Sequence, residues 1–131
     1  MVANNATEIA VGIYGQCLAL QRDGTVYGWN ENGAGEATGV PSKAPGSRGL
    51  VTINGQVLTN VSEIAAGTRF SLALRGDGTV AAWGRIDNAR SSVTLPVGLS
   101  NVVAIAAGGE FCLAVTTNRA VAEKFRQRRD E

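Results

Sequence analysis

The sequence predicts an all-β fold, a partial β-propeller of about two and a half blades built from short antiparallel meanders. Three observations predict it: a strand-like unit occurs three times, tight turns separate its apolar segments, and glycine is abundant. The 131 residues include 17 glycines, roughly twice the usual share. Hydrophobic residues make up 44% of the chain, which is enough for a packed core. We expect residues 1–131 to form a single domain.

An alanine-rich segment marks the start of each unit. Its three copies read EIAVG, EIAAG and AIAAG, and they end at Gly12, Gly67 and Gly108. Small side chains indicate inner strands that crowd around a central axis, and we expect each glycine to adopt a backbone conformation that other residues avoid. The pattern divides the chain into repeat one at 8–62, repeat two at 63–103, an incomplete repeat three at 104–118 and a basic tail at 119–131.

An Asp-Gly pair follows the second apolar segment in each of the first two units. Asp23 and Gly24 in repeat one, and Asp77 and Gly78 in repeat two, are predicted to form type I′ hairpin turns. The two aspartates could be taken for a catalytic carboxylate pair. We assign them instead to the turns, because a short carboxylate before glycine accepts hydrogen bonds from nearby backbone amides.

A third apolar segment follows each turn and carries a tryptophan, Trp29 in repeat one and Trp83 in repeat two. We expect each indole to pack against the neighbouring blade, since its burial removes a large apolar area from water. A role in ligand stacking or at an interface is the alternative. Cys17 and Cys112 occupy the position of Ser71 in the repeat, so we expect small buried residues and no disulfide between them.

The third unit lacks both the Asp-Gly turn and the tryptophan. We expect its tail to form a short C-terminal helix or an unstructured end, because Asn118 is a suitable N-cap and Val121 and Phe125 are four residues apart. The basic cluster at 124–129 is interpreted as a solvated end. With a net charge of only +1, the chain does not favour nucleic acid or an anionic membrane as a partner.

The composition excludes several kinds of catalytic and metal site. The chain has no histidine, which excludes a Ser-His-Asp triad and imidazole ligation of a metal. Its longest apolar run, 102–107, is too short to span a bilayer. The glycine-rich segment 32–39 lacks the full pattern of a phosphate-binding loop and is interpreted as a loop between blades. We therefore expect no enzyme activity, no catalytic residues, no metal and no cofactor.

These motifs resemble the regulator of chromosome condensation repeat family. Ile64–Leu74 and Asp77–Gly84 match its patterns I-A-A-G-x-x-H-S-L-A-L and D-G-x-V-x-x-W-G nearly throughout. The histidine of the pattern is replaced in every unit, by Gln16, Phe70 and Phe111. The resemblance implies a propeller of four-stranded blades, and a soluble bacterial protein that is secreted or located at the cell surface.

An arc of so few blades exposes strand edges and apolar sheet faces. Closed propellers use about 4–8 blades. Two explanations fit: the chain is a fragment of a longer protein, which we favour, or copies self-associate to close a ring.

The leading functional hypothesis is a non-catalytic module that binds a protein partner through loops on one face. The variable residues that follow the inner-strand glycines are expected on that face. Tyr14, Arg69 and Glu110 are the candidate partner-binding residues, since an aromatic side chain, a cation and an anion suit a mixed recognition surface. The alternatives are a structural repeat segment of a larger secreted or surface protein, and a secreted propeller that inhibits an enzyme.

Overall fold

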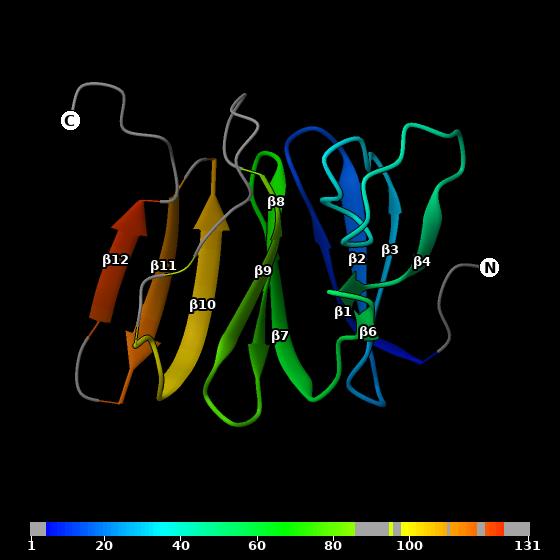
Figure 1. Ribbon diagram of the computed structural model, residues 1–131. Helices are drawn as coiled ribbons and strands as arrows, with labels where there is room; N and C mark the ends of the chain where they lie inside the picture. Colours follow the sequence, from blue (N-terminus) through cyan, green and yellow to red (C-terminus); the bar gives the residue numbers. More distant parts are fainter. Residues whose placement is uncertain (1–4, 86–94, 96–97, 110, 118–119, 125–131) are drawn as a thin grey trace, which may run out of the picture.

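The computed structural model describes residues 5–85, 95, 98–109, 111–117 and 120–124. These residues form twelve β-strands in antiparallel sheets and contain no helix, so the predicted all-β fold is confirmed. Figure 1 shows the three larger sheets following one another across the molecule in chain order. No helix able to cross a membrane occurs in the part of the chain that the structure describes.

Each sheet is a meander in which every strand pairs with the next one along the chain. The first sheet contains β1 (Ala6–Val11), β2 (Gln16–Gln21), β3 (Val26–Asn30) and β4 (Arg48–Leu50). The second contains β7 (Val61–Ala66), β8 (Phe70–Arg75) and β9 (Val80–Gly84). The third contains β10 (Val102–Gly108), β11 (Phe111–Thr116) and β12 (Ala120–Lys124). A small separate hairpin pairs β5 (Thr52–Ile53) with β6 (Gln56–Val57).

The three sheets share a register irregularity near the start of their first strands. The pairing shifts between Ala6 and Glu8, between Val61 and Glu63, and between Val102 and Ala104. Such a bulge strengthens the local twist of a strand. Its recurrence shows that the three sequence units fold in the same way. The innermost strands are neighbours, since β7 packs against both β1 and β10.

The Asp-Gly turns lie where they were predicted, but their type differs. The amide of Gly24 donates to the carbonyl of Gln21 at 2.9 Å, and Gly24 has a φ of 88° while Asp23 does not have a positive φ. This is a type I turn followed by a left-handed glycine, so the type I′ prediction is wrong. The Asp23 carboxylate accepts hydrogen bonds from the amide and hydroxyl of Thr25, at 3.0 and 2.6 Å. Repeat two has the same contacts between Asp77 and Thr79.

The C-terminal helix is a further correction, because residues 120–124 form the strand β12. This strand pairs with β11, from Val115 opposite Ala120 to Phe111 opposite Lys124. A helix this short is marginal by itself, whereas pairing satisfies the backbone groups along the free edge of β11. The remainder of the expected helix, 125–131, and its N-cap Asn118 lie outside the described residues.

The hydrophobic core lies between successive sheets. Leu18, Leu20 and Val26 of the first sheet pack with Ile64 and Trp83 of the second. At the next boundary Phe70 and Leu72 of the second sheet pack against Ile105 and Cys112 of the third. Apolar faces of neighbouring sheets therefore bury one another, as in a stack of propeller blades.

Two carboxylates add hydrogen bonds across these boundaries. Glu8 of the first sheet accepts from the amide of Ile64 in the second at 2.9 Å. Glu63 of the second sheet accepts from the amide of Ile105 in the third at 3.2 Å. Both acceptors occupy the same position in their repeats. Each therefore joins the inner strand of one sheet to the inner strand of the next.

Candidate functional site: a basic pocket at the loop face

The loops of the three sheets gather at two opposite edges of the molecule. The Asp-Gly turns lie along the lower edge in Figure 1, and the β1–β2 and β7–β8 loops lie along the upper edge. The long segment between β3 and β4, residues 31–47, also lies along the upper edge. We call this upper edge, formed by residues 12–15, 31–47 and 67–69, the loop face.

Asn32 organises the long loop from its interior. Its side chain is buried, its carbonyl oxygen accepts from the amides of Ala37 and Thr38 at 3.0 Å, and its amide group donates to the hydroxyl of Ser47 at 2.9 Å. The hydroxyl of Ser71, on the second sheet, donates to the carbonyl of Glu36 at 2.6 Å. The glycine-rich segment 32–39 is therefore part of the loop that joins β3 to β4 within the first sheet, and it packs against the second sheet. The prediction of a loop that connects two blades is wrong.

Gln16 joins the first two sheets below the loop face. This buried side chain occupies the place of the repeat histidine, and its amide group donates to the carbonyls of Gly67 and Phe70 at 3.1 Å. A Cβ on Gly67 would overlap the Phe70 ring. The glycine is therefore required for space, and the predicted special conformation is wrong, since Gly67, Gly12 and Gly108 lack a positive φ.

Tyr14 and Arg69 meet on the loop face. The Tyr14 side chain is 53% exposed, and the Arg69 guanidinium carbon lies 4.4 Å from the centre of its ring. This is a cation–π contact between the β1–β2 loop and the β7–β8 loop. The backbone also connects the two loops, through a hydrogen bond of 3.3 Å from Ile13 to Gly67. The third candidate partner-binding residue, Glu110, lies outside the described residues.

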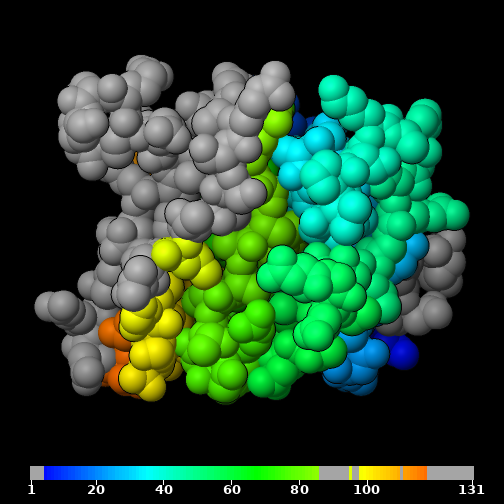
Figure 2. Space-filling model, in the orientation of Figure 1, coloured from blue at the N-terminus to red at the C-terminus, as the bar shows by residue number. Residues whose placement is uncertain are grey.

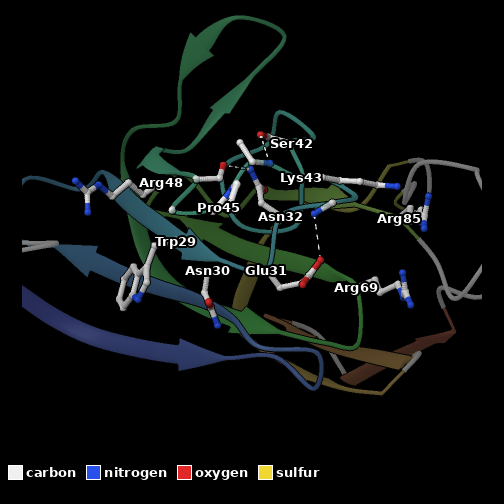
Figure 3. A pocket seen from close by; sticks show the side chains of 14 residues that line it. Trp29, Asn30, Glu31, Asn32, Ser42, Lys43, Pro45, Arg48, Arg69 and Arg85 are labelled. Atoms are coloured by element: carbon white, nitrogen blue, oxygen red, sulfur yellow. Dashed lines mark hydrogen bonds between the residues drawn. The ribbon is translucent and has the colours of Figure 1, made fainter.

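A pocket of about 590 Å³ opens beside this pair, between the long loop and the ends of the second sheet. Figure 2 shows the cyan long loop lying against the yellow-green end of β9. The charged and aromatic residues that line the pocket are Trp29, Glu31, Lys43, Arg48, Arg69 and Arg85 (Figure 3). The pocket therefore draws on both of the first two repeats.

Positive charge dominates this pocket. Its wall carries four cations and one carboxylate, although the whole chain has a net charge of only +1. Within the described part of the chain, none of these four cations forms an ion pair. The Nε atoms of Arg69 and Arg85 are buried and have no hydrogen-bond partner. Glu31, the one carboxylate, accepts from the amide of Gly33 at 3.3 Å.

The two tryptophans lie in different surroundings. Trp83 is buried in the core between the first and second sheets, and its indole nitrogen has no hydrogen-bond partner. Trp29 is half-buried, lines the pocket, and has its ring centre 6.2 Å from that of Tyr27.

Cys17 is half-buried, and no disulfide joins it to Cys112. The described residues contain no group of three or more side chains arranged to hold a metal ion.

Comparison with known proteins agrees with this architecture. Residues 61–90 match the family model of the regulator of chromosome condensation (RCC1) repeat. The chain contains an RCC1 repeat. The match covers repeat two up to residue 90, including the β7–β9 sheet and its Asp-Gly turn. No curated protein matches the sequence significantly.

Three solved structures share the fold. Yeast RCC1 (Prp20) bound to Kap60 is 22% identical over 88% of this chain and 31% of its own, with a TM-score of 0.62. Prp20p from Saccharomyces cerevisiae is 18% identical over 95% and 39%, with a TM-score of 0.63. Human WBSCR16 is 19% identical over 86% and 31%, with a TM-score of 0.59. The described fold is thus a partial β-propeller that spans at most 39% of these RCC1-like chains.

Proposed function

We propose that this chain is a non-catalytic interaction module that presents its loop face to a protein partner. The observation that carries the proposal is the contact between the exposed Tyr14 ring and the half-buried Arg69 side chain. Tyrosine and arginine are enriched among residues that dominate binding energy. In this contact each side chain restricts the conformations of the other before a partner binds, which lowers the side-chain conformational entropy that is lost on binding.

The similar structures support a protein partner as the class of ligand. Prp20 is seen in complex with Kap60, and its binding to Gsp1p and histones has been characterised. These partners belong to those proteins. For this chain, we propose that Glu110 contributes with Tyr14 and Arg69, since it occupies the corresponding loop of repeat three.

The test compares capture of partner proteins by the wild-type chain and by a Tyr14→Ala, Arg69→Ala double variant. Arg22→Ala is the matched control, since Arg22 is exposed at the opposite edge of the first sheet. We expect the double variant to lose the proteins that the wild-type and control chains both retain. Far-UV circular dichroism checks that the variants fold. Equal capture by all three folded chains would remove the loop face as the binding surface.

A second proposal concerns the two end faces of the stack, which are the outer face of the first sheet and the outer face of the third sheet. Ile64, which faces the preceding sheet, is 8% exposed, whereas the equivalent Ile9 is 71% exposed. Leu72, which faces the following sheet, is 1% exposed, whereas the equivalent Leu113 is 51% exposed. These differences favour head-to-tail association, in which a second copy places its Ile9 face on the Leu113 face of the first.

Light scattering over a range of concentrations tests this association. Ile9→Asp and Leu113→Asp each remove one half of the same interface, so each variant alone should be monomeric. A mixture of the two should form a heterodimer through the one intact pair of faces. Ala104→Glu should strengthen association, because it restores the carboxylate that accepts from the next sheet in the first two repeats. A wild-type chain that stays monomeric at every concentration rules the association out.

A further inference from the structure

We propose that the basic pocket binds a phosphate group, with Lys43, Arg69 and Arg85 as its donors. The site lies beside the Tyr14–Arg69 contact, and its unpaired donors, its charge and its volume support this ligand. Its ligand is a phosphate monoester, carried either by a phosphorylated side chain of the protein partner or by a phosphorylated small molecule.

Two arginines of the pocket have donor groups without an acceptor. Arg69 and Arg85 each bury an Nε–H group that lacks an acceptor. A buried donor without a partner is costly, so such groups are usually satisfied by a ligand, an ion or water. The two residues are held together by their backbones, since the amide of Arg85 donates to the carbonyl of Arg69 at 3.0 Å. Their guanidinium groups therefore enter the pocket from one rigid corner.

Three cations of the pocket lie close to one another. In Figure 3 the side chain of Lys43 extends toward Arg85, and Arg69 lies on the same side of the pocket. Three like charges that converge, with Glu31 as the one carboxylate in the pocket wall, repel one another. An anion between them replaces that repulsion with charge-assisted hydrogen bonds.

The amount of charge selects the class of anion. Four cations against Glu31 leave the pocket wall with a formal charge of +3, obtained as four minus one. A carboxylate supplies about one negative charge, whereas a phosphate monoester supplies about −1.5 to −2 at neutral pH. Arginine also binds phosphate through two parallel N–H groups. The phosphate therefore neutralises the pocket more fully.

The size of the pocket indicates that the phosphate is attached to a larger group. Its volume of about 590 Å³ lies within the usual range for ligand sites, about 300–1,000 Å³, and a bare phosphate would fill only a part. Trp29 and Arg48 lie at the end of the pocket opposite to Arg85 in Figure 3. We expect the group that carries the phosphate to lie against Trp29.

The glycine-rich loop itself does not act as the phosphate cradle. The amides of Ala37 and Thr38 already donate to Asn32, and the amide of Ala34 donates to Glu36 at 2.7 Å. A cradle requires backbone amides that point at the ligand and are free to donate. Recognition therefore rests on the side chains of the cations, which come from separate parts of the chain.

Titration calorimetry with the full chain tests the site. The probes are inorganic phosphate, pyrophosphate, a phosphoserine pentapeptide and the same pentapeptide with serine. We expect the phosphorylated probes to bind and the serine peptide to bind at least about tenfold more weakly. A phosphopeptide that binds more tightly than pyrophosphate identifies a phosphorylated partner as the source, and the reverse order identifies a small molecule.

Arg85→Ala and Lys43→Ala locate the site, because neither residue belongs to the Tyr14–Arg69 contact. Each should weaken phosphate binding at least about tenfold, while Arg22→Ala leaves it unchanged. No binding of any phosphorylated probe, or equal binding to folded Arg85→Ala, overturns the proposal. Loss of phosphate binding in Arg85→Ala or Lys43→Ala, with partner capture unchanged, assigns the effect to the phosphate site alone. Tyr14→Ala alone keeps every proposed phosphate donor, so loss of partner capture with phosphate binding intact in this variant concerns the proposed function only.

Discussion

Replacing Glu8 should loosen the boundary between the first two sheets. The carboxylate accepts from the amide of Ile64 at 2.9 Å, and Ile64 itself is buried in the core of that boundary. A hydrogen bond to a charged group contributes about 1.5–3 kcal/mol when it is protected from water. Glu8 is exposed, so solvent screening reduces this contribution. We expect Glu8→Ala to lower the free energy of unfolding by about 1 kcal/mol.

Urea unfolding followed by far-UV circular dichroism measures this change. With a slope of about 2 kcal/mol per molar urea, a loss of about 1 kcal/mol lowers the midpoint by about 0.5 M. Glu8→Gln keeps a neutral acceptor and should lose about half as much. Arg22→Ala is the control, because this exposed side chain lies at the opposite edge of the first sheet.

The same substitution at Glu63 provides an independent copy of the experiment. Glu63 accepts from the amide of Ile105 at the next boundary, at the longer distance of 3.2 Å. The two boundaries are separate, so the losses in a Glu8→Ala, Glu63→Ala double variant should add. If Glu8→Ala unfolds at the wild-type urea concentration, or if Glu8→Gln is as damaging as Glu8→Ala, the reasoning fails.

Two further predictions concern the turns and the inner-strand glycines. The hydroxyl and amide hydrogen bonds of Thr79 hold the pKa of Asp77 below its ordinary value. These hydrogen bonds therefore stabilise the folded chain at neutral pH, and this stabilisation is lost as the pH falls through the acidic range below that ordinary value. Urea midpoints measured across the acidic range should therefore fall less steeply in Asp77→Asn than in the wild type. Gly67→Ala should destabilise by about 1–3 kcal/mol, because its Cβ overlaps the Phe70 ring, whereas Gly108→Ala has open space and should leave the thermal midpoint nearly unchanged.

The repeats made most of the sheet architecture predictable. Each unit carries its own strands, turn and closing glycine, so the strand order follows from short-range pairing. The type of the Asp-Gly turn was not predictable to the same extent. Asp23 and Gly24 suit either a two-residue turn or a type I turn with a left-handed glycine, and only the strand register selects between them.

The tail shows that the local sequence pattern alone does not always predict secondary structure. Residues 120–124 have a composition that a helix tolerates, but β11 offers them a row of unpaired backbone groups. For such a short segment, pairing with a neighbouring strand determines the structure, and the local sequence pattern does not.

The inter-sheet role of Glu8 was also missed. Its signal is present in the sequence, as a glutamate before the same isoleucine in the first two units and Ala104 in the third.

The cations of the pocket were missed for a different reason. Arg69 belongs to a repeat loop and was among the candidates, but Lys43 lies in the long loop of repeat one and Arg48 begins β4 directly after that loop. Arg85 directly follows β9 of repeat two. Nothing in their spacing relates these residues, because the fold brings them together only when one sheet packs on the next.

The pocket therefore depends on the boundary between two repeats. The first repeat contributes Trp29 and Lys43, the second contributes Arg69 and Arg85, and Gln16 holds the two sheets together beneath them. A loop that changes in one repeat thus alters only one wall of the pocket, while the sheet core beneath it stays packed. In a stack of this kind, recognition can vary at each boundary although the strands of every repeat remain alike.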